Sequence, residues 1–187
     1  VITGFGRLGA PTASEYFGVT PDLLTMAKAI NNAAIPMGAV AASRAVHDAV
    51  INAGAANAIE FFHGYTYSAH PSAAAAAIAA LDIYKRERLF ERAKELSGAF
   101  EDAVHELRNS PHVKDIRNLG LVAGIELESR ADAPGARAYE VFLKCFEAGV
   151  LVRYTGDILA FSPPLIVDER QIDQIFSTVG DALRQVG

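Results

Sequence analysis

The sequence has no tryptophan, a single cysteine and no long apolar run. Cys145 has no partner for an internal disulfide, and its place in an apolar helical stretch predicts a buried, reduced thiol. A membrane-spanning helix needs about 18 or more consecutive apolar residues, whereas the densest apolar stretch, Ser72 to Leu81, is mostly alanine. We therefore expect a protein that does not cross a membrane and that works in the cytoplasm.

Long blocks of like charge are also missing. The 17 Lys and Arg residues and 22 Asp and Glu residues give a formal net charge of -5, spread along the chain. This distribution does not favour binding to nucleic acid or to an anionic membrane surface. With 51% hydrophobic and 21% charged residues, the composition is typical of a folded globular protein rather than a disordered or fibrous one.

Patterns that mark metal or nucleotide binding are not found either. The five histidines have no metal-ligand spacing with one another or with the cysteine, so no metal site is predicted. The glycine-rich segment Gly4 to Gly9 lacks the strand–loop–helix setting of a dinucleotide fingerprint and is interpreted as a loop. Val1-Ile2 precedes it as the end of a strand, without an initiator Met or a signal-peptide pattern, and we expect the chain to be a fragment that begins in mid-strand.

The first half of the chain alternates short apolar runs with helical segments. Leu23 to Ala27 predicts a buried strand whose tip is Lys28, and Gly38 to Ala42 predicts a second strand. Ser43 can cap a helix that continues through Val50. Strands that alternate with helices indicate an α/β architecture.

A long helix is predicted to begin at Pro71. Proline is tolerated in the first helical turn, and the run Ala73 to Ala80 has the highest helix propensity available. Apolar residues then recur every three or four positions from Leu89 to Leu107, which predicts one continuous helix able to bridge two domains.

The second half predicts a smaller α+β part. Asp168, with Gln171 three residues later, resembles a capping box at the start of the last helix. The α/β part covers residues 1 to 85 and the α+β part covers 86 to 187. Four strands and one further helix are predicted from periodicity: strands Val113 to Ile116, Leu121 to Leu127, Val150 to Arg153 and Ile158 to Phe161, and a helix from Ala136 to Phe146.

Three residues are candidates for chemistry, each with an ordinary alternative. Lys28 is the only lysine in the first 84 residues and follows an apolar run, so its amine either has a task or reaches out to water along an apolar stem. Thr66 offers a hydroxyl and a backbone N–H just before a helix, where phosphate can bind, or is a plain turn residue. Arg153, at the end of a short strand, can pair with a carboxylate or form a surface ion pair.

Six segments, in order, resemble motifs of the class III pyridoxal-phosphate-dependent aminotransferases, and the likeness is greatest to the ω-amino acid:pyruvate branch. The resemblance covers nearly the whole chain. The segments are Thr3 to Arg7, Pro21 to Lys28, Ile35 to Val40, Gly64 to Pro71, Gly120 to Gly124 and Val152 to Asp157.

The resemblance implies the second half of a fold type I large domain over residues 1 to 85, followed by the small C-terminal domain. It implies that Lys28 carries pyridoxal 5'-phosphate as a Schiff base and moves protons during the reaction. It also implies that Thr66 reaches the cofactor phosphate of a neighbouring subunit, so that a homodimer shares its active sites, and that Arg153 binds the substrate carboxylate.

The resemblance further implies that an Asp-Glu pair, whose aspartate binds the pyridinium nitrogen, precedes Val1. The aromatic ring that stacks on the cofactor and a phosphate-binding helix start also belong to the missing half. We therefore expect the isolated chain to be inactive.

The function implied for the parent enzyme is transamination between an ω-amino acid or amine, such as β-alanine, and pyruvate. One alternative is a class III aminotransferase that uses 2-oxoglutarate with an ornithine, γ-aminobutyrate or diamine donor. Another is a non-catalytic dimerisation module in which Lys28 is only structural.

Overall fold

The computed structural model describes residues 1–59 and 61–187, which fall into two compact units. The first unit consists of Val1–Phe5 and Pro11–Arg88, and the second of Gly6–Ala10 and Leu89–Gly187. The assignment of residues 1 to 85 and 86 to 187 to two domains stays a prediction.

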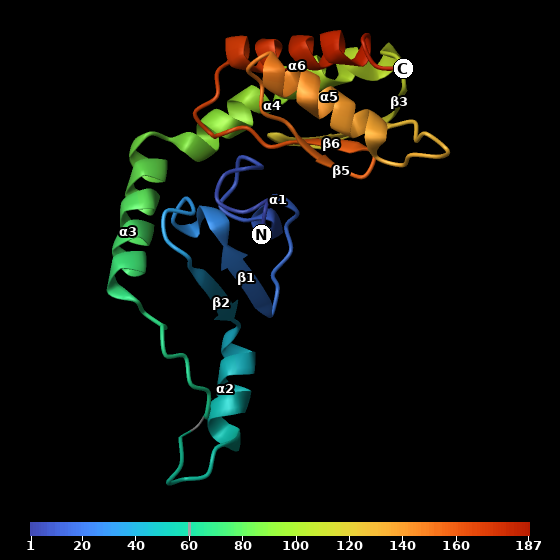
Figure 1. Cartoon of the computed structure of the whole chain (residues 1–187). Coiled ribbons are helices and arrows are strands. Elements are labelled where there is room, and N and C mark those ends of the chain that lie inside the picture. The colour runs from blue at the N-terminus through green and yellow to red at the C-terminus, as the bar shows by residue number, and fades with distance from the viewer. Residues whose placement is uncertain (60) are drawn as a thin grey trace. The chain divides into compact units, whose positions relative to one another are not determined.

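The first unit is built on a two-stranded antiparallel sheet. Strand β1 (Leu23–Ala27) pairs with β2 (Gly38–Ala42), with Ala27 opposite Gly38 (Figure 1). Both predicted strands are confirmed, but β1 is not buried, since Leu23 is 57% exposed. The reason is that β1 has only β2 as a neighbour in the sheet.

One helix precedes this hairpin in the sequence and another follows it. α1 (Ala13–Tyr16) is a single turn, and α2 (Arg44–Ala53) begins after Ser43, whose hydroxyl accepts a hydrogen bond from the Val46 N–H at 3.4 Å. The predicted cap at Ser43 is thus confirmed. The predicted strand end at Val1-Ile2 is wrong, because residues 2–10 form turns and bends.

The predicted long helix is two helices. α3 (Pro71–Arg86) ends where Arg88 adopts a left-handed φ of 51°, and α4 (Leu89–His105) begins at the next residue. The Arg88 N–H donates to the Lys85 carbonyl at 3.3 Å, so the left-handed residue closes the last turn of α3. The sequence did not predict this break, because no glycine marks position 88 and the helical spacing of apolar residues continues across it.

The apolar stripe predicted from Leu89 to Leu107 is confirmed, since its residues on α4 are buried, and α3 also buries one set of its residues. α4 continues into a short 3-10 helix, η2 (Glu106–Asn109). The buried residues are Ala73, Ala77, Ala80 and Tyr84 in α3, and Leu89, Ala93, Leu96, Phe100 and Val104 in α4.

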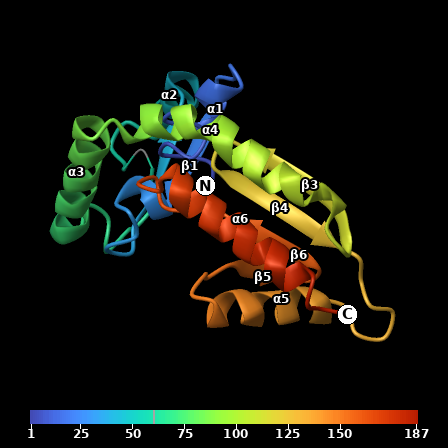
Figure 2. The same cartoon turned by 90° about the horizontal axis from the view of Figure 1, so that it is seen from above.

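The second unit is a four-stranded antiparallel sheet with helices on one face (Figure 1 and Figure 2). Its strand order is β3-β4-β6-β5, and α4 packs against β3 and α6, while α5 packs against β5 and α6. Alternate residues of β4 are buried, as expected for a sheet with one covered face. The elements are β3 (Val113–Leu119), β4 (Val122–Leu127), α5 (Ala136–Glu147), β5 (Arg153–Thr155), β6 (Ile158–Phe161) and α6 (Glu169–Leu183).

Most local signals of this unit are confirmed. The Asp168 carboxylate accepts the Gln171 N–H at 2.7 Å, and the Gln171 side chain accepts the Asp168 N–H at 3.1 Å, which completes the capping box of α6. The strand predicted at Val150 to Arg153 is displaced, because pairing with β6 begins only at Arg153. Val150 and Val152 are apolar because they are buried in the core, not because they belong to a strand.

Within the described residues no helix is both long enough and apolar enough to traverse a bilayer.

Candidate functional site

Lys28 follows β1 directly and has an unusual backbone conformation. It begins the one-turn 3-10 helix η1 (Lys28–Ile30) with a left-handed φ of 52°, and Asn32 and Ala33 have φ values of 53° and 56°. Such conformations cost about 1–3 kcal/mol each in residues other than glycine, and they cluster at functional sites. The backbone at this lysine is therefore held in place by its surroundings.

Two side chains that the sequence analysis did not single out hold this turn. Asn31 is 2% exposed, and its side-chain N–H donates to the Ile35 carbonyl at 2.7 Å. The Tyr84 hydroxyl, from α3, donates to the Ala29 carbonyl at 2.7 Å, and burial raises the pKa of this phenol. The Asn31-Asn32 pair is a sequence signal for a left-handed turn, whereas nothing in the sequence connects Tyr84 to residue 29.

Lys28 itself is exposed in the part of the chain that the structure describes. In the described part of the chain, no carboxylate lies within ion-pair distance of its amine. The residues of this chain thus fix the backbone of Lys28 and leave its side chain exposed.

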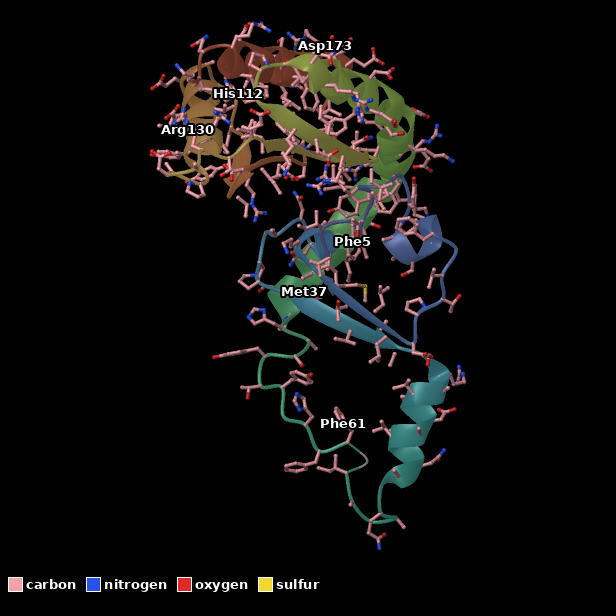
Figure 3. All side chains as sticks on the ribbon, turned by 90° about the vertical axis from the view of Figure 1, so that its right-hand side faces the viewer. Phe5, Met37, Phe61, His112, Arg130 and Asp173 are labelled. Carbon is pink, nitrogen blue, oxygen red and sulfur yellow. The ribbon has the colours of Figure 1, made fainter. Side chains whose placement is uncertain are left out.

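A cavity of about 760 Å³ opens in the first unit and contains Thr66 in its wall. Gly38 also lines this cavity. Because Gly38 pairs with Ala27, the residue before Lys28, the cavity wall lies next to the start of the Lys28 turn. Figure 3 labels Met37, another wall residue, beside the hairpin. The lining residues are Ile35 to Gly38, Gly64 to His70, Ala73 and Ala74.

The donors in this cavity suit an anion. Four of the lining residues, Tyr65, Thr66, Tyr67 and Ser68, carry hydroxyl groups, and no Asp or Glu is among the described residues of the wall. The N-terminus of α3, with its unpaired backbone N–H groups, follows at Pro71. This set of neutral donors can hold a phosphate group. No contact between the side chains of Lys28 and Thr66 is found among the described residues.

Arg153 lies in the second unit and lines a different cavity. It is the first residue of β5, opposite Ala160 of β6, and its side chain is exposed. The cavity has a volume of about 480 Å³ and is mostly apolar, with Phe142, Leu151 and Pro163 among its wall residues. Within the described chain no carboxylate pairs with the guanidinium. An unpaired guanidinium beside apolar walls can bind a carboxylate that carries a short apolar group.

Metal and thiol chemistry find no support in the described residues. No group of three or more His, Cys, Asp and Glu side chains in this part of the chain could hold a metal ion. Cys145 is fully buried, as predicted, and burial raises the pKa of its thiol to about 11. It is therefore protonated at neutral pH and not poised as a nucleophile.

Comparison with known proteins gives a consistent set of relatives. Residues 1–183 match the family model described as aminotransferase class-III. Over 186 residues the chain is 59% identical to an omega-aminotransferase of Caulobacter vibrioides, and over 187 residues it is 46% identical to a beta-alanine–pyruvate aminotransferase of Pseudomonas aeruginosa. The whole chain takes part in each match but spans only 42% of either relative's length. A gamma-aminobutyrate transaminase of Oryza sativa is 38% identical over 190 residues.

Solved structures agree with these matches. An (S)-enantioselective omega-transaminase from Thermomicrobium roseum superposes with a TM-score of 0.89 at 31% identity, covering 99% of this chain and 42% of that one. A transaminase from Virgibacillus superposes with a TM-score of 0.87 at 32% identity, covering 99% and 44%. The fold predicted from the resemblance, part of a fold type I transferase with its small C-terminal domain, is confirmed.

Proposed function

The chain belongs to the class III aminotransferase family, and we propose that the parent enzyme transfers an amino group from an ω-amino acid or amine to pyruvate with pyridoxal phosphate as cofactor. The observation that carries this proposal is the placement of Lys28, an accessible amine at the end of β1 on a strained, anchored turn. The omega-aminotransferase and beta-alanine–pyruvate aminotransferase relatives support the donor and acceptor classes.

The residues present fit the proposed cofactor. The Lys28 amine has no competing carboxylate in the described chain, and the cavity that contains Thr66 offers neutral donors suited to a phosphate. Lys28 would hold the cofactor's aldehyde through Nζ, and Thr66 would bind a phosphate oxygen. When bound, pyridoxal phosphate supplies the electron sink for deprotonation at the substrate carbon.

Lys28 would also move the proton. Its Nζ would accept the proton that leaves the substrate carbon and then return it, as a base followed by an acid. Lys28 is exposed among the described residues, so an incoming substrate can reach it.

We assign the substrate carboxylate to Arg153. A guanidinium forms two parallel hydrogen bonds to a carboxylate, and the apolar wall beside Arg153 suits the methyl group of pyruvate. A donor without a carboxylate would use the apolar wall rather than the guanidinium, which accounts for two substrate types in one site.

A homodimer with shared sites is part of the proposal. The loop between α2 and α3 exposes many aromatic residues, and Figure 3 shows Phe61 on it. Phe62 is 88% exposed and Tyr67 is 84% exposed, which is unusual for a surface in contact with water alone. A second subunit that covers this loop would bring Thr66 to the cofactor phosphate of its neighbour. The buried, protonated Cys145 fits a reducing cytoplasm, where we expect the enzyme to work.

A second candidate is a donor such as γ-aminobutyrate with 2-oxoglutarate as acceptor, and the relative of that donor class at 38% identity favours it. Steady-state rates with pyruvate and 2-oxoglutarate, each paired with β-alanine and γ-aminobutyrate, separate the two. A clear preference for 2-oxoglutarate would replace the first candidate by the second.

The cofactor assignment is tested by absorption spectra of the parent enzyme with pyridoxal phosphate, recorded before and after borohydride reduction. We expect wild type to form a reducible adduct, and tryptic mapping to find the added mass on the peptide that contains Lys28. Lys28→Ala should lose this adduct. Lys85→Ala, which removes the next lysine along the chain from the end of α3, should retain it. An unchanged reducible adduct in Lys28→Ala contradicts the proposal.

A further inference from the structure

The loop Gly6–Ala10 belongs to the second unit, although its neighbours on both sides belong to the first. Its residues pack closely on the turn between β3 and β4: the Leu121 N–H donates to the Arg7 carbonyl at 2.9 Å, and Leu8 is only 4% exposed. Gly120 permits this approach, since a Cβ at that position would lie 2.6 Å from the Arg7 carbonyl oxygen. The loop is thus a fixed part of the unit that contains Arg153.

The Arg7 guanidinium donates hydrogen bonds to two backbone carbonyls of the second unit. Its Nη1 donates to the Leu121 carbonyl at 3.2 Å and also to the Pro163 carbonyl. In the described part of the chain no carboxylate pairs with it. Burial lowers the pKa of Arg7, which means that its charge is held partly out of water. The Arg7 guanidinium is therefore stabilised by its hydrogen bonds to the two carbonyls and not by an ion pair.

One of these partners belongs to the wall of the Arg153 cavity. Ser162, Pro163 and Pro164 line that cavity, and they lie in the irregular segment between β6 and α6. Pro163 and Pro164 have no backbone N–H with which to anchor the segment. The hydrogen bond from Arg7 therefore holds the backbone of this wall at Pro163.

We propose that Arg7 is a positioning residue for the carboxylate subsite at Arg153, acting through the Pro163 carbonyl. The inference rests on the proposed function, because it takes Arg153 as the group that binds the substrate carboxylate. Without the Arg7 hydrogen bond the wall at Pro163 can move, and the carboxylate and its apolar group no longer fit the guanidinium and the wall together. Substrates that use Arg153 lose affinity, while an amine without a carboxylate does not.

The test uses the holoenzyme and measures the two half-reactions separately, with pyruvate as acceptor and benzylamine as the carboxylate-free donor. We expect Arg7→Met, which keeps an apolar stem and removes all donors, to raise KM for pyruvate about tenfold. KM for benzylamine should change less than about twofold, since no carboxylate is involved. Arg7→Lys retains a cationic donor and should restore much of the lost affinity. Arg117→Met, which removes an exposed arginine of β3, should change neither KM.

A purely structural role for Arg7 predicts a different pattern. Arg7→Met would then reduce both half-reactions equally, in parallel with a lower unfolding temperature, and this result would overturn the inference. If Arg7→Met does not fold, Arg7→Lys decides in its place: a smaller rise in KM confined to pyruvate supports the inference, and equal changes for both substrates refute it.

Arg153→Ala, measured alone and together with Arg7→Met, separates the inference from the proposed function. If Arg153→Ala leaves KM for pyruvate unchanged, the assignment of Arg153 itself has failed. If it raises KM for pyruvate, the added effect of Arg7→Met in the double variant should vanish, because both changes act on one interaction. Fully additive effects in the double variant would show that Arg7 acts elsewhere.

Discussion

Gly120→Ala should detach the loop Gly6–Ala10 from the turn between β3 and β4. Gly120 has a left-handed φ of 55°, and an added Cβ would lie 2.6 Å from the Arg7 carbonyl oxygen and 2.8 Å from Leu8 Cα. Both of these are backbone atoms, so no side-chain rotation can relieve the collision. The loop itself must move away.

The expected cost has two parts. A left-handed alanine costs about 1 kcal/mol relative to glycine. Displacing the loop breaks the hydrogen bond between the Leu121 N–H and the Arg7 carbonyl, which contributes about 1 kcal/mol, and re-exposes much of Leu8, which contributes about 2 kcal/mol. The sum is about 4 kcal/mol, of which about 3 kcal/mol comes from loss of the loop.

Gly156→Ala is a matched control. Gly156 has the same φ of 55°, but a Cβ there would meet no atom within 4 Å. This variant should therefore show only the backbone cost of about 1 kcal/mol.

Hydrogen exchange in the parent enzyme measures the difference locally. Opening of the Leu121 amide should become easier by about 3 kcal/mol in Gly120→Ala, which corresponds to exchange about 100-fold faster. Gly156→Ala should leave exchange at Leu121 close to that of wild type. Equal exchange in the two variants would refute the close approach of the loop, and with it the premise of the Arg7 inference.

Three further predictions concern other parts of the chain. Arg153→Ala should lower kcat/KM for pyruvate and alanine by at least about tenfold more than for a carboxylate-free amine, and equal losses in steady-state assays count against its carboxylate role. Cys145, whose pKa is raised from 9.0 to about 11, should resist alkylation at neutral pH until the protein unfolds. Because the pKa of this thiol is higher in the folded than in the unfolded state, its contribution to stability is complete below pH 9 and is lost as pH rises toward 11. Asp168→Ala should cost about 1 kcal/mol in urea unfolding through loss of the α6 cap, and a change as small as that of Arg170→Ala, on the exposed first turn, would argue against the capping box.

Local signals predicted most elements of this protein. Pro71 marks the start of α3, the pair Asp168 and Gln171 marks the start of α6, and alternation marks β4. Two of the misplaced features, the helix break at Arg88 and the start of β5 at Arg153, have no local signal. In both places an apolar pattern records burial and does not distinguish which backbone conformation achieves it.

For the candidate site, the sequence marked Lys28, Thr66 and Arg153 as candidates, and only the family resemblance gave each of them a role. Composition and spacing could not exclude an ordinary surface role for any of them. The structure adds the left-handed turn at Lys28, the cavity beside Thr66 and the apolar cavity beside Arg153. The roles of these three residues stay proposals.

By itself the sequence determined where strands and helices form and to which family the chain is similar, because propensities, caps and motifs act between residues close in the chain. Only the tertiary structure decided which side chains hold the turn at Lys28 and the loop Gly6–Ala10. Arg7 meets the carbonyls of Leu121 and Pro163 across 114 and 156 positions, and Tyr84 meets that of Ala29 across 55. Such contacts form only when the fold brings the backbone carbonyl of a distant segment to face a donor. Because every residue carries the same carbonyl group, no pattern of side chains predicts which carbonyl will be the acceptor.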